Sequence, residues 1–347
     1  MSLAVIISPN WKDYAERFLH DCLVSLRAQT MQDFKIFLID NETTETSFAF
    51  LKSQASEAEI IGLEKNEGFA EGNNAALRIA IKQGFDYCAL INMDTVLDQN
   101  CLADLMLAAS TNPEAAIQAR LMMWPEQDKV NSFGNLTHFL GFGFSKGYRE
   151  DFKNQEPGIK EIAYPSGAAV LLPTSALREI GLFDSKMWMY NEDQDLGWRF
   201  WLSGRSCLIA ESAVVYHKYE FSRSVTKFYW MDRNRIIAIL KNYHLLTLIA
   251  IAPAFMIMEC GLILFSLKSG WFKEKMRVWA YFLSTKHWRY IMAERKKIQA
   301  ARKISDRVAT KLFSGRIWYQ EIDDPKLRLI NPFFAFYWKV VRTVMFW

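Results

Sequence analysis

Acidic side chains are most concentrated at Glu192, Asp193 and Asp195, which fall within four positions. Carboxylates this close repel one another unless a cation or a reaction requires them. The segment from Glu192 has the composition of a helix N-terminus, where the helix dipole favours acidic residues. Asp195 and Arg199 are four residues apart, which predicts a structural ion pair between them. Glu192 and Asp193 therefore remain available for a cation or for a reaction.

A further acid, Asp94, follows an apolar run at 87–91 that indicates a buried strand. Folds that alternate strands and helices bind ligands at the carboxyl ends of their strands. A hard cation that bridges phosphate oxygens would use such a carboxylate. The alternative is that Asp94 only closes a turn or caps a helix beginning near Asp98.

Strand-like and helix-like segments alternate over the first 120 residues. We expect strands at 3–7, 34–39, 59–63, 87–91 and 115–122, and helices at 15–29, 74–83 and 99–109. This order predicts an α/β domain with a mostly parallel sheet. Right-handed crossovers would bring Asn10, Asp40, Asn66 and Asp94 to one sheet edge. Residues 131–160 show little periodicity and predict a long loop or lid beside that edge.

The composition places further bounds on the chain. Its 347 residues suggest two domains, or one domain with a long appendage. Five scattered cysteines without a CxxC pair favour a reducing compartment and no structural zinc. The first residues lack the basic region and the cleavage site of a secretory signal, so none is expected.

Several short motifs occur in a fixed order over residues 3–220. They are Asn10 after the first strand, Ile39-Asp40-Asn41, Asn66-x-Gly68-Phe69-Ala70-x-Gly72-Asn73-Asn74, Asn92-Met93-Asp94-Thr95, Gly167-Ala168-Ala169, Gly181-Leu182-Phe183-Asp184 and Glu192-Asp193-x-Asp195-Leu196-x-x-Arg199. Each motif alone is weak. As a set they resemble family 2 glycosyltransferases of the GT-A fold, in the bacterial rhamnosyltransferase-like branch.

The resemblance implies a nucleotide-sugar donor and a set of residues that bind it. Those residues are Pro9, Asn10, Asp40, Asn66, Gly68, Asn73, Asn92, Asp94 and Arg233. Asp40 would hold the base or the ribose, and Arg233 would contact the diphosphate. A solvated or lipid-facing charge is the alternative for Arg233.

The resemblance also implies a divalent cation, Mg²⁺ or Mn²⁺. Asp94 stands at the first acid of the family's DxD motif, whereas Val96 replaces the second acid. Related chains with one acid complete the coordination with diphosphate, water and a downstream histidine, and His217 stands at that position. A core histidine is the alternative for His217.

The family's chemistry assigns the general base to Asp193, which gives one displacement with inversion at the anomeric carbon. Glu192 would serve as the base instead or orient the acceptor. A base is needed because an acceptor hydroxyl is a poor nucleophile. The Gln-x-x-Arg-Trp motif of processive members does not occur, which favours the transfer of a single sugar.

The C-terminal part suggests a membrane. Residues 268–347 hold 18 Lys and Arg against 6 Asp and Glu, and their basic residues alternate with aromatic ones. This pattern is typical of segments that lie on an anionic bilayer. Nucleic acid is the competing partner, but it does not explain the apolar run at 245–267, which is long enough to span a bilayer. A span would leave the basic tail outside, so we expect a broken, re-entrant or interfacial helix pair.

The sequence therefore predicts a GT-A domain at 1–225 and a helical membrane-association region at 226–347. The expected enzyme lies on the cytoplasmic face of the bacterial inner membrane. It transfers one sugar to a polyprenyl-diphosphate-linked saccharide, with dTDP-L-rhamnose as one candidate donor. The alternatives are a UDP-hexose transferase of the same fold and a catalytically inactive membrane scaffold.

Overall fold

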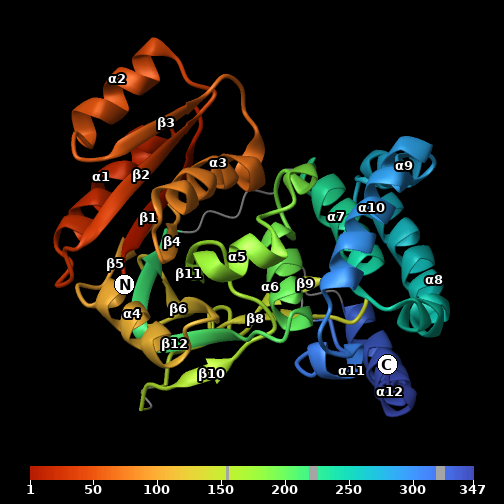
Figure 1. Ribbon diagram of the computed structural model, residues 1–347. Coiled ribbons are helices and arrows are strands. Elements are labelled where there is room, and N and C mark those ends of the chain that lie inside the picture. The colour runs from red at the N-terminus through yellow and green to blue at the C-terminus, as the bar shows by residue number, and fades with distance from the viewer. Residues whose placement is uncertain (154–155, 219–225, 318–324) are drawn as a thin grey trace.

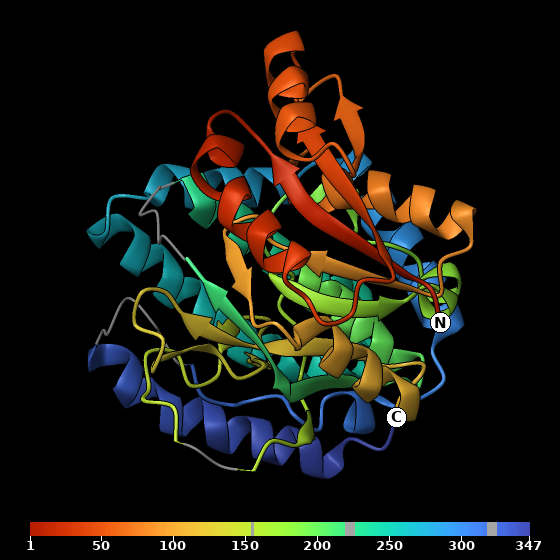
Figure 2. The ribbon, with the colours of Figure 1, turned by 90° about the vertical axis from the view of Figure 1, so that its left-hand side faces the viewer.

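The computed structural model describes residues 1–153, 156–218, 226–317 and 325–347. A mixed β-sheet forms the centre of the N-terminal part, with helices on both faces (Figure 1). Helices α7 to α12 gather beside this sheet. Helices α2 and α12 lie at opposite ends of the molecule in both views (Figure 2).

The main path of the sheet has the strand order β10-β12-β6-β11-β4-β1-β2-β3. Its strands are β1 (Leu3–Asn10), β2 (Phe34–Asn41), β3 (Glu59–Leu63), β4 (Tyr87–Ile91), β6 (Ala116–Met123), β10 (Ile159–Glu161), β11 (Ala169–Pro173) and β12 (Cys207–His217). The strands β1 to β4 are parallel, and β11 runs antiparallel between β4 and β6. Every residue of β4 and β11 is buried, as expected for strands covered on both faces.

Four short strands complete the β structure. They are β5 (Thr95–Leu97), β7 (Val130–Ser132), β8 (Asn135–Thr137) and β9 (Gly143–Ser145). Three of them, with β10, fall largely inside 131–160, where we predicted a long loop or lid, so the expected lack of regular structure was wrong, although Asn135 and 143–145 do line the cavity described below. Three-residue strands are too short to show a periodic pattern, so only their pairing reveals them.

The helices of the N-terminal part are α1 (Tyr14–Arg27), α2 (Glu45–Gln54), α3 (Gly68–Gln83), α4 (Cys101–Thr111), α5 (Thr174–Ile180), η1 (Ser185–Met187) and α6 (Glu192–Leu202). The sequence did not predict α2. This helix buries only Leu51 and therefore lacks an apolar stripe, although Thr44 and Ser47 form a capping box at its start. Helix α3 begins six residues before the predicted position because its first turns contain glycine and asparagine, which are weak helix formers.

The C-terminal helices are α7 (Thr226–Asn242), α8 (Leu245–Lys268), α9 (Phe272–Phe282), α10 (Thr285–Ala301), α11 (Asp306–Ala309) and α12 (Pro325–Val344). Helix α8 is continuous, so the expected break in this segment was wrong, whereas the re-entrant and interfacial forms of the expected helix pair stay predictions. It is the one helix of the described residues that is long and apolar enough to cross a membrane. One face of α8 is buried, whereas Ile249, Ile257 and Leu264 on its other sides are exposed.

Buried charges fasten α8 to its neighbours. Glu259 is 1% exposed and accepts hydrogen bonds from Arg235 of α7 and Lys275 of α9. Asp232 lies 2.6 Å from both cations and completes a four-residue cluster without net charge. Burial of ions costs free energy unless each charge is paired. Glu259 therefore fixes α8 against α7 and α9 and does not face lipid.

The two predicted parts share one hydrophobic cluster. Phe139 stacks on Trp338 of α12 at 5.0 Å, and Trp198 of α6 meets Phe313 at 4.8 Å. The predicted boundary at residue 225 lies outside the described residues.

The substitution Glu259→Gln should lower the free energy of unfolding by about 3–5 kcal/mol, because it leaves Arg235 and Lys275 with one buried carboxylate. Thermal and urea unfolding of the purified chain in detergent measure this loss. The matched control is Glu294→Gln, which breaks a solvent-facing pair with Lys297 and should cost about 1 kcal/mol or less. Equal losses for both variants would contradict the anchoring role.

Candidate active site

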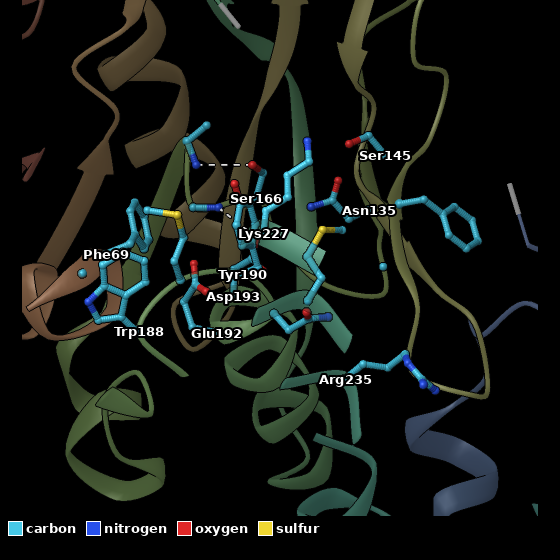
Figure 3. A pocket seen from close by; sticks show the side chains of 18 of the residues that line it. Phe69, Asn135, Ser145, Ser166, Trp188, Tyr190, Glu192, Asp193, Lys227 and Arg235 are labelled. Atoms are coloured by element: carbon cyan, nitrogen blue, oxygen red, sulfur yellow. Dashed lines mark hydrogen bonds between the residues drawn. The ribbon is translucent and has the colours of Figure 1, made fainter. Parts of the chain in front are cut away.

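A cavity of about 700 Å³ opens at the carboxyl ends of β1 and β4. Ser8 and Pro9 line it from β1, and Asn92 and Asp94 line it from the turn after β4. Further walls come from the β8–β9 region, from the start of α6, and from α7 and α8. Figure 3 shows Phe69 and Trp188 along one side of this cavity and Asn135 and Ser145 along the other.

Asp94 and His217 meet in this cavity because β5 pairs with the end of β12. His217 lies opposite Thr95, and its Nε2 is 3.2 Å from Asp94 Oδ1. The His217 Nδ1 atom lies 3.1 Å from Asn131 Oδ1, which orients the ring. Burial acts to raise the pKa of Asp94, but the charge of His217 and hydrogen bonds outweigh it, so this pKa is lowered. Asp94 is therefore ionised at neutral pH.

These residues fit a divalent cation that is shared with a bound phosphate. Asn92 Oδ1 is buried in the cavity lining and has no hydrogen-bond partner among the described residues. Asp94 and His217 add one carboxylate and one imidazole. The described residues contain no group of three or more Cys, His, Asp or Glu side chains that could hold a metal. Mg²⁺ sites of this kind use one or two carboxylates together with substrate phosphates.

The loop before α3 brings Asn66 and Gly68 to the cavity. Asn66 Oδ1 accepts hydrogen bonds from Asn41 Nδ2 and from the Gly68 backbone N–H, both at 2.9 Å. Gly68 has φ +75°, and a Cβ atom there would lie 2.4 Å from the carbonyl oxygen of Trp188. Only glycine allows this close approach between the α3 loop and the segment before α6.

Four predicted donor-binding residues do not line the cavity. Asn10 donates to Asp40 Oδ1 at 3.1 Å, and Asp40 Oδ2 accepts a hydrogen bond from Ser47 at 2.6 Å. Asn73 donates to the carbonyl oxygen of Phe69 at 2.8 Å, and Arg233 donates to a backbone carbonyl behind the site. These side chains form the layer behind the cavity wall.

The acidic cluster begins α6 and points two carboxylates toward the cavity. Asp193 accepts hydrogen bonds from the backbone N–H groups of Gln194, at 2.7 Å, and Gly167, at 3.4 Å. Burial raises the pKa of Asp193 to about 6, although these hydrogen bonds oppose the shift. Burial and then repulsion from Asp193 raise the pKa of Glu192 well above its usual range. The raised pKa of Glu192 favours its protonated form, while Asp193 is mostly ionised at neutral pH.

The predicted ion pair between Asp195 and Arg199 is confirmed, with Arg199 Nε 3.0 Å from Asp195 Oδ2. Lys241 of α7 lies 3.1 Å from the other oxygen of Asp195. Asp195 is completely buried and belongs to the framework of the site.

The segment that precedes α6 adopts an unusual backbone conformation. Trp188, Tyr190 and Asn191 all have φ between 62° and 69°, a region that residues other than glycine rarely occupy. The Asn234 amide of α7 lies 2.7–2.9 Å from the carbonyl oxygens of Met187, Met189 and Tyr190. Strained conformations persist only where the surroundings impose them. Asn234 therefore positions the segment that leads into the Glu192–Asp193 pair.

The cavity also contains residues that the sequence analysis missed. Lys227, Met231 and Arg235 all line it from α7, and Trp188 lines it from the strained segment. The spacing of four between the α7 residues places them on one helix face, and this signal was available in the sequence. Figure 3 shows Lys227, Asp193 and Ser166 toward the middle of the site.

Comparison with known proteins identifies the class. Residues 5–180 match the model of glycosyl transferase family 2, so the chain belongs to that family, and the expected GT-A fold is confirmed. An N-acetylglucosaminyl-diphospho-decaprenol L-rhamnosyltransferase of Mycobacterium tuberculosis is 25% identical over 236 residues, covering 62% of this chain and 74% of the relative. The O-antigen biosynthesis protein RfbC of Myxococcus xanthus is 26% identical over 128 residues, covering 35% of this chain and 9% of that protein.

Two solved structures share the fold. Residues 1–349 of S. aureus TarS, in complex with UDP-GlcNAc, superpose with a TM-score of 0.53 at 15% identity, covering 99% of this chain and 91% of that one. GalNAc-T7 with UDP, GalNAc and Mn²⁺ superposes with a TM-score of 0.54 at 12% identity. That match covers 69% of this chain and 48% of the GalNAc-T7 chain.

The substitution Asn234→Ala should release the strained segment, because the carbonyl oxygens of Met187, Met189 and Tyr190 lose the hydrogen bonds from the Asn234 amide. Hydrogen exchange of the amides in residues 186–191 should quicken at least about tenfold, and the free energy of unfolding should fall by about 1–3 kcal/mol. The matched control is Asn112→Ala, whose amide bonds only to Ala108 and Thr111 at the end of α4. Unchanged exchange at 186–191 in the Asn234 variant would contradict this role.

Proposed function

We propose that this glycosyltransferase transfers one sugar from a nucleotide-sugar donor to a lipid-linked saccharide, with inversion at the anomeric carbon. The observation that carries the proposal is the presence of two different acidic sites in one cavity. Asp94 stays ionised beside His217, and the Glu192–Asp193 pair lies at the start of α6.

Asp193 is the proposed general base. The acceptor hydroxyl gives its proton to Asp193 while its oxygen forms a bond to the anomeric carbon, and the bond from that carbon to the nucleoside diphosphate breaks. A base works best with a pKa near the working pH, which the value of about 6 for Asp193 satisfies. The raised pKa of Glu192 favours its protonated form, which is suited to donate a hydrogen bond to the acceptor or donor sugar.

Asp94, His217 and Asn92 are the proposed ligands of Mg²⁺ or Mn²⁺ together with the donor diphosphate. When bound, the cation neutralises charge that develops on the leaving diphosphate. The Mn²⁺ and UDP in the GalNAc-T7 structure support a divalent cation for the fold. Asn66 and Gly68 form the neighbouring wall, where the rest of the nucleotide would lie.

The proposed acceptor is a polyprenyl-diphosphate-linked saccharide. The name of the M. tuberculosis relative describes such an acceptor and an L-rhamnosyl group, which supports this kind of transfer. We keep dTDP-L-rhamnose as the candidate donor. Exposed apolar side chains of α8 and α12 support contact with a membrane, namely Ile257 and Leu264 in one helix and Phe336 and Val344 in the other. We place the enzyme on the cytoplasmic face of the bacterial inner membrane, bound from one side.

Donor turnover tests the proposal directly. Purified protein in detergent receives a panel of nucleotide sugars, Mg²⁺ or Mn²⁺ and a lipid-diphosphate saccharide. Asp193→Asn should lower kcat by at least about 1000-fold with donor binding retained, since it removes the base. Asp94→Asn should weaken donor binding in the presence of cation.

The control for both variants is Asp128→Asn, an exposed carboxylate outside the cavity that should keep full activity. Turnover of UDP-hexose alone would favour the alternative donor. The absence of binding for every donor would favour the inactive scaffold.

The pH dependence follows from the raised pKa of Asp193. Below about pH 6 the carboxyl group is protonated and cannot accept the hydroxyl proton, so kcat/KM should fall tenfold for each further pH unit. Above about pH 6 Asp193 is ionised, so kcat/KM should stop rising with pH and level off. A profile that is flat between pH 4.5 and 7.5, with the fold intact by circular dichroism, would exclude Asp193 as the base.

A further inference from the structure

One end of the cavity is apolar. Five large side chains line it, Phe228 and Met231 from α7, Leu262 and Phe265 from α8, and Trp271 before α9. Phe228 stacks on Trp271 at 5.0 Å, and the edge of Phe265 meets the same indole at 6.3 Å. An apolar chain would gain more from contact with this wall than the hydroxyl groups of a sugar would. The wall therefore suits an apolar part of a substrate.

Polar groups lie beside this apolar wall. Lys227 lines the cavity one helical turn before Met231, and its ammonium group is suited to an anion. Trp271 is 3% exposed, and its Nε1–H has no hydrogen-bond partner among the described residues. The cationic Lys227 and the apolar wall together suit a molecule with an anionic head and an apolar chain.

Helix α8 separates this apolar end from the outer surface. Leu262 is 9% exposed and lines the cavity, whereas Leu264, two residues later, is 69% exposed on the outside. The outer side continues with the exposed residues Ile249, Met256 and Ile257. The apolar end of the cavity is thus one helix away from the surface that we place against the bilayer.

We propose that this apolar end binds the first isoprene units of the polyprenyl diphosphate acceptor, with its diphosphate near Lys227 and Trp271. The inference rests on the proposed function, because it assigns the lipid part of the acceptor to named residues. It also explains why α7 and α8, which follow the residues matched to the family model, form part of the cavity.

The test measures equilibrium binding to the full chain in dodecyl maltoside micelles. The probes are inorganic diphosphate, geranyl diphosphate and farnesyl diphosphate. The Kd should fall at least about tenfold from inorganic to farnesyl diphosphate, because each isoprene unit buries further CH₂ and CH₃ groups. Leu262→Asn should remove most of this gain, and the matched control Leu264→Asn should retain it.

A second variant keeps the test decisive if Leu262→Asn does not fold. Met231 lines the cavity but is 39% exposed, so Met231→Gln should fold normally and still weaken the binding of farnesyl diphosphate. The same Kd for all three diphosphates would overturn the proposed lipid site. Binding of short-chain phosphatidic acid as tight as that of farnesyl diphosphate would assign the site to a bilayer lipid instead.

Nucleotide binding separates this inference from the proposed function. The same samples are titrated with UDP and dTDP in the presence of Mn²⁺. If a nucleotide binds and chain length has no effect, only the lipid site fails. If farnesyl diphosphate binds with the expected dependence on Leu262 and neither nucleotide binds, the transferase proposal fails while the lipid site stands.

Discussion

The site depends on how the protein divides its support among the three carboxylates at the start of α6. Lys241 and Arg199 form ion pairs with Asp195. Asp193 accepts hydrogen bonds from backbone N–H groups, and the helix dipole favours acidic residues at this position. Burial raises the pKa of Asp193 to about 6 and that of Glu192 well above its usual range. The framework acid is thus paired with cations, whereas burial makes the two acids at the cavity bind a proton more readily than exposed carboxylates do.

Much of this arrangement could be predicted from the sequence because it depends on local rules. The spacing of Asp195 and Arg199 predicted their ion pair, and the order of strands and helices predicted the sheet edge. Gly68 belongs to one of the predicted motifs, and the close contact with the Trp188 backbone explains why this position has no side chain. The meeting of Asp94 and His217 was implied only by the family resemblance, since 123 positions separate them in the chain and nothing local connects the two.

The remaining features depend on long-range packing, which a single sequence does not reveal. Arg233 was predicted to contact the diphosphate, but its side chain donates to backbone carbonyl groups. Lys227 and Arg235 of the same helix line the cavity instead. Glu259 has its partner Lys275 in the following helix, so local sequence rules do not reveal this pair. In both cases the decisive fact is the rotation of a helix about its axis, which only tertiary contacts fix.

Three consecutive residues of α7 connect regions that are otherwise separate. Arg233 and Asn234 hold the strained segment before α6, and Arg235 joins Glu259 of α8. Because Asn234 and Arg235 are adjacent, a turn of α7 about its own axis would displace both the segment that leads into the Glu192–Asp193 pair and the buried face of α8. The two regions therefore share one helix as their support.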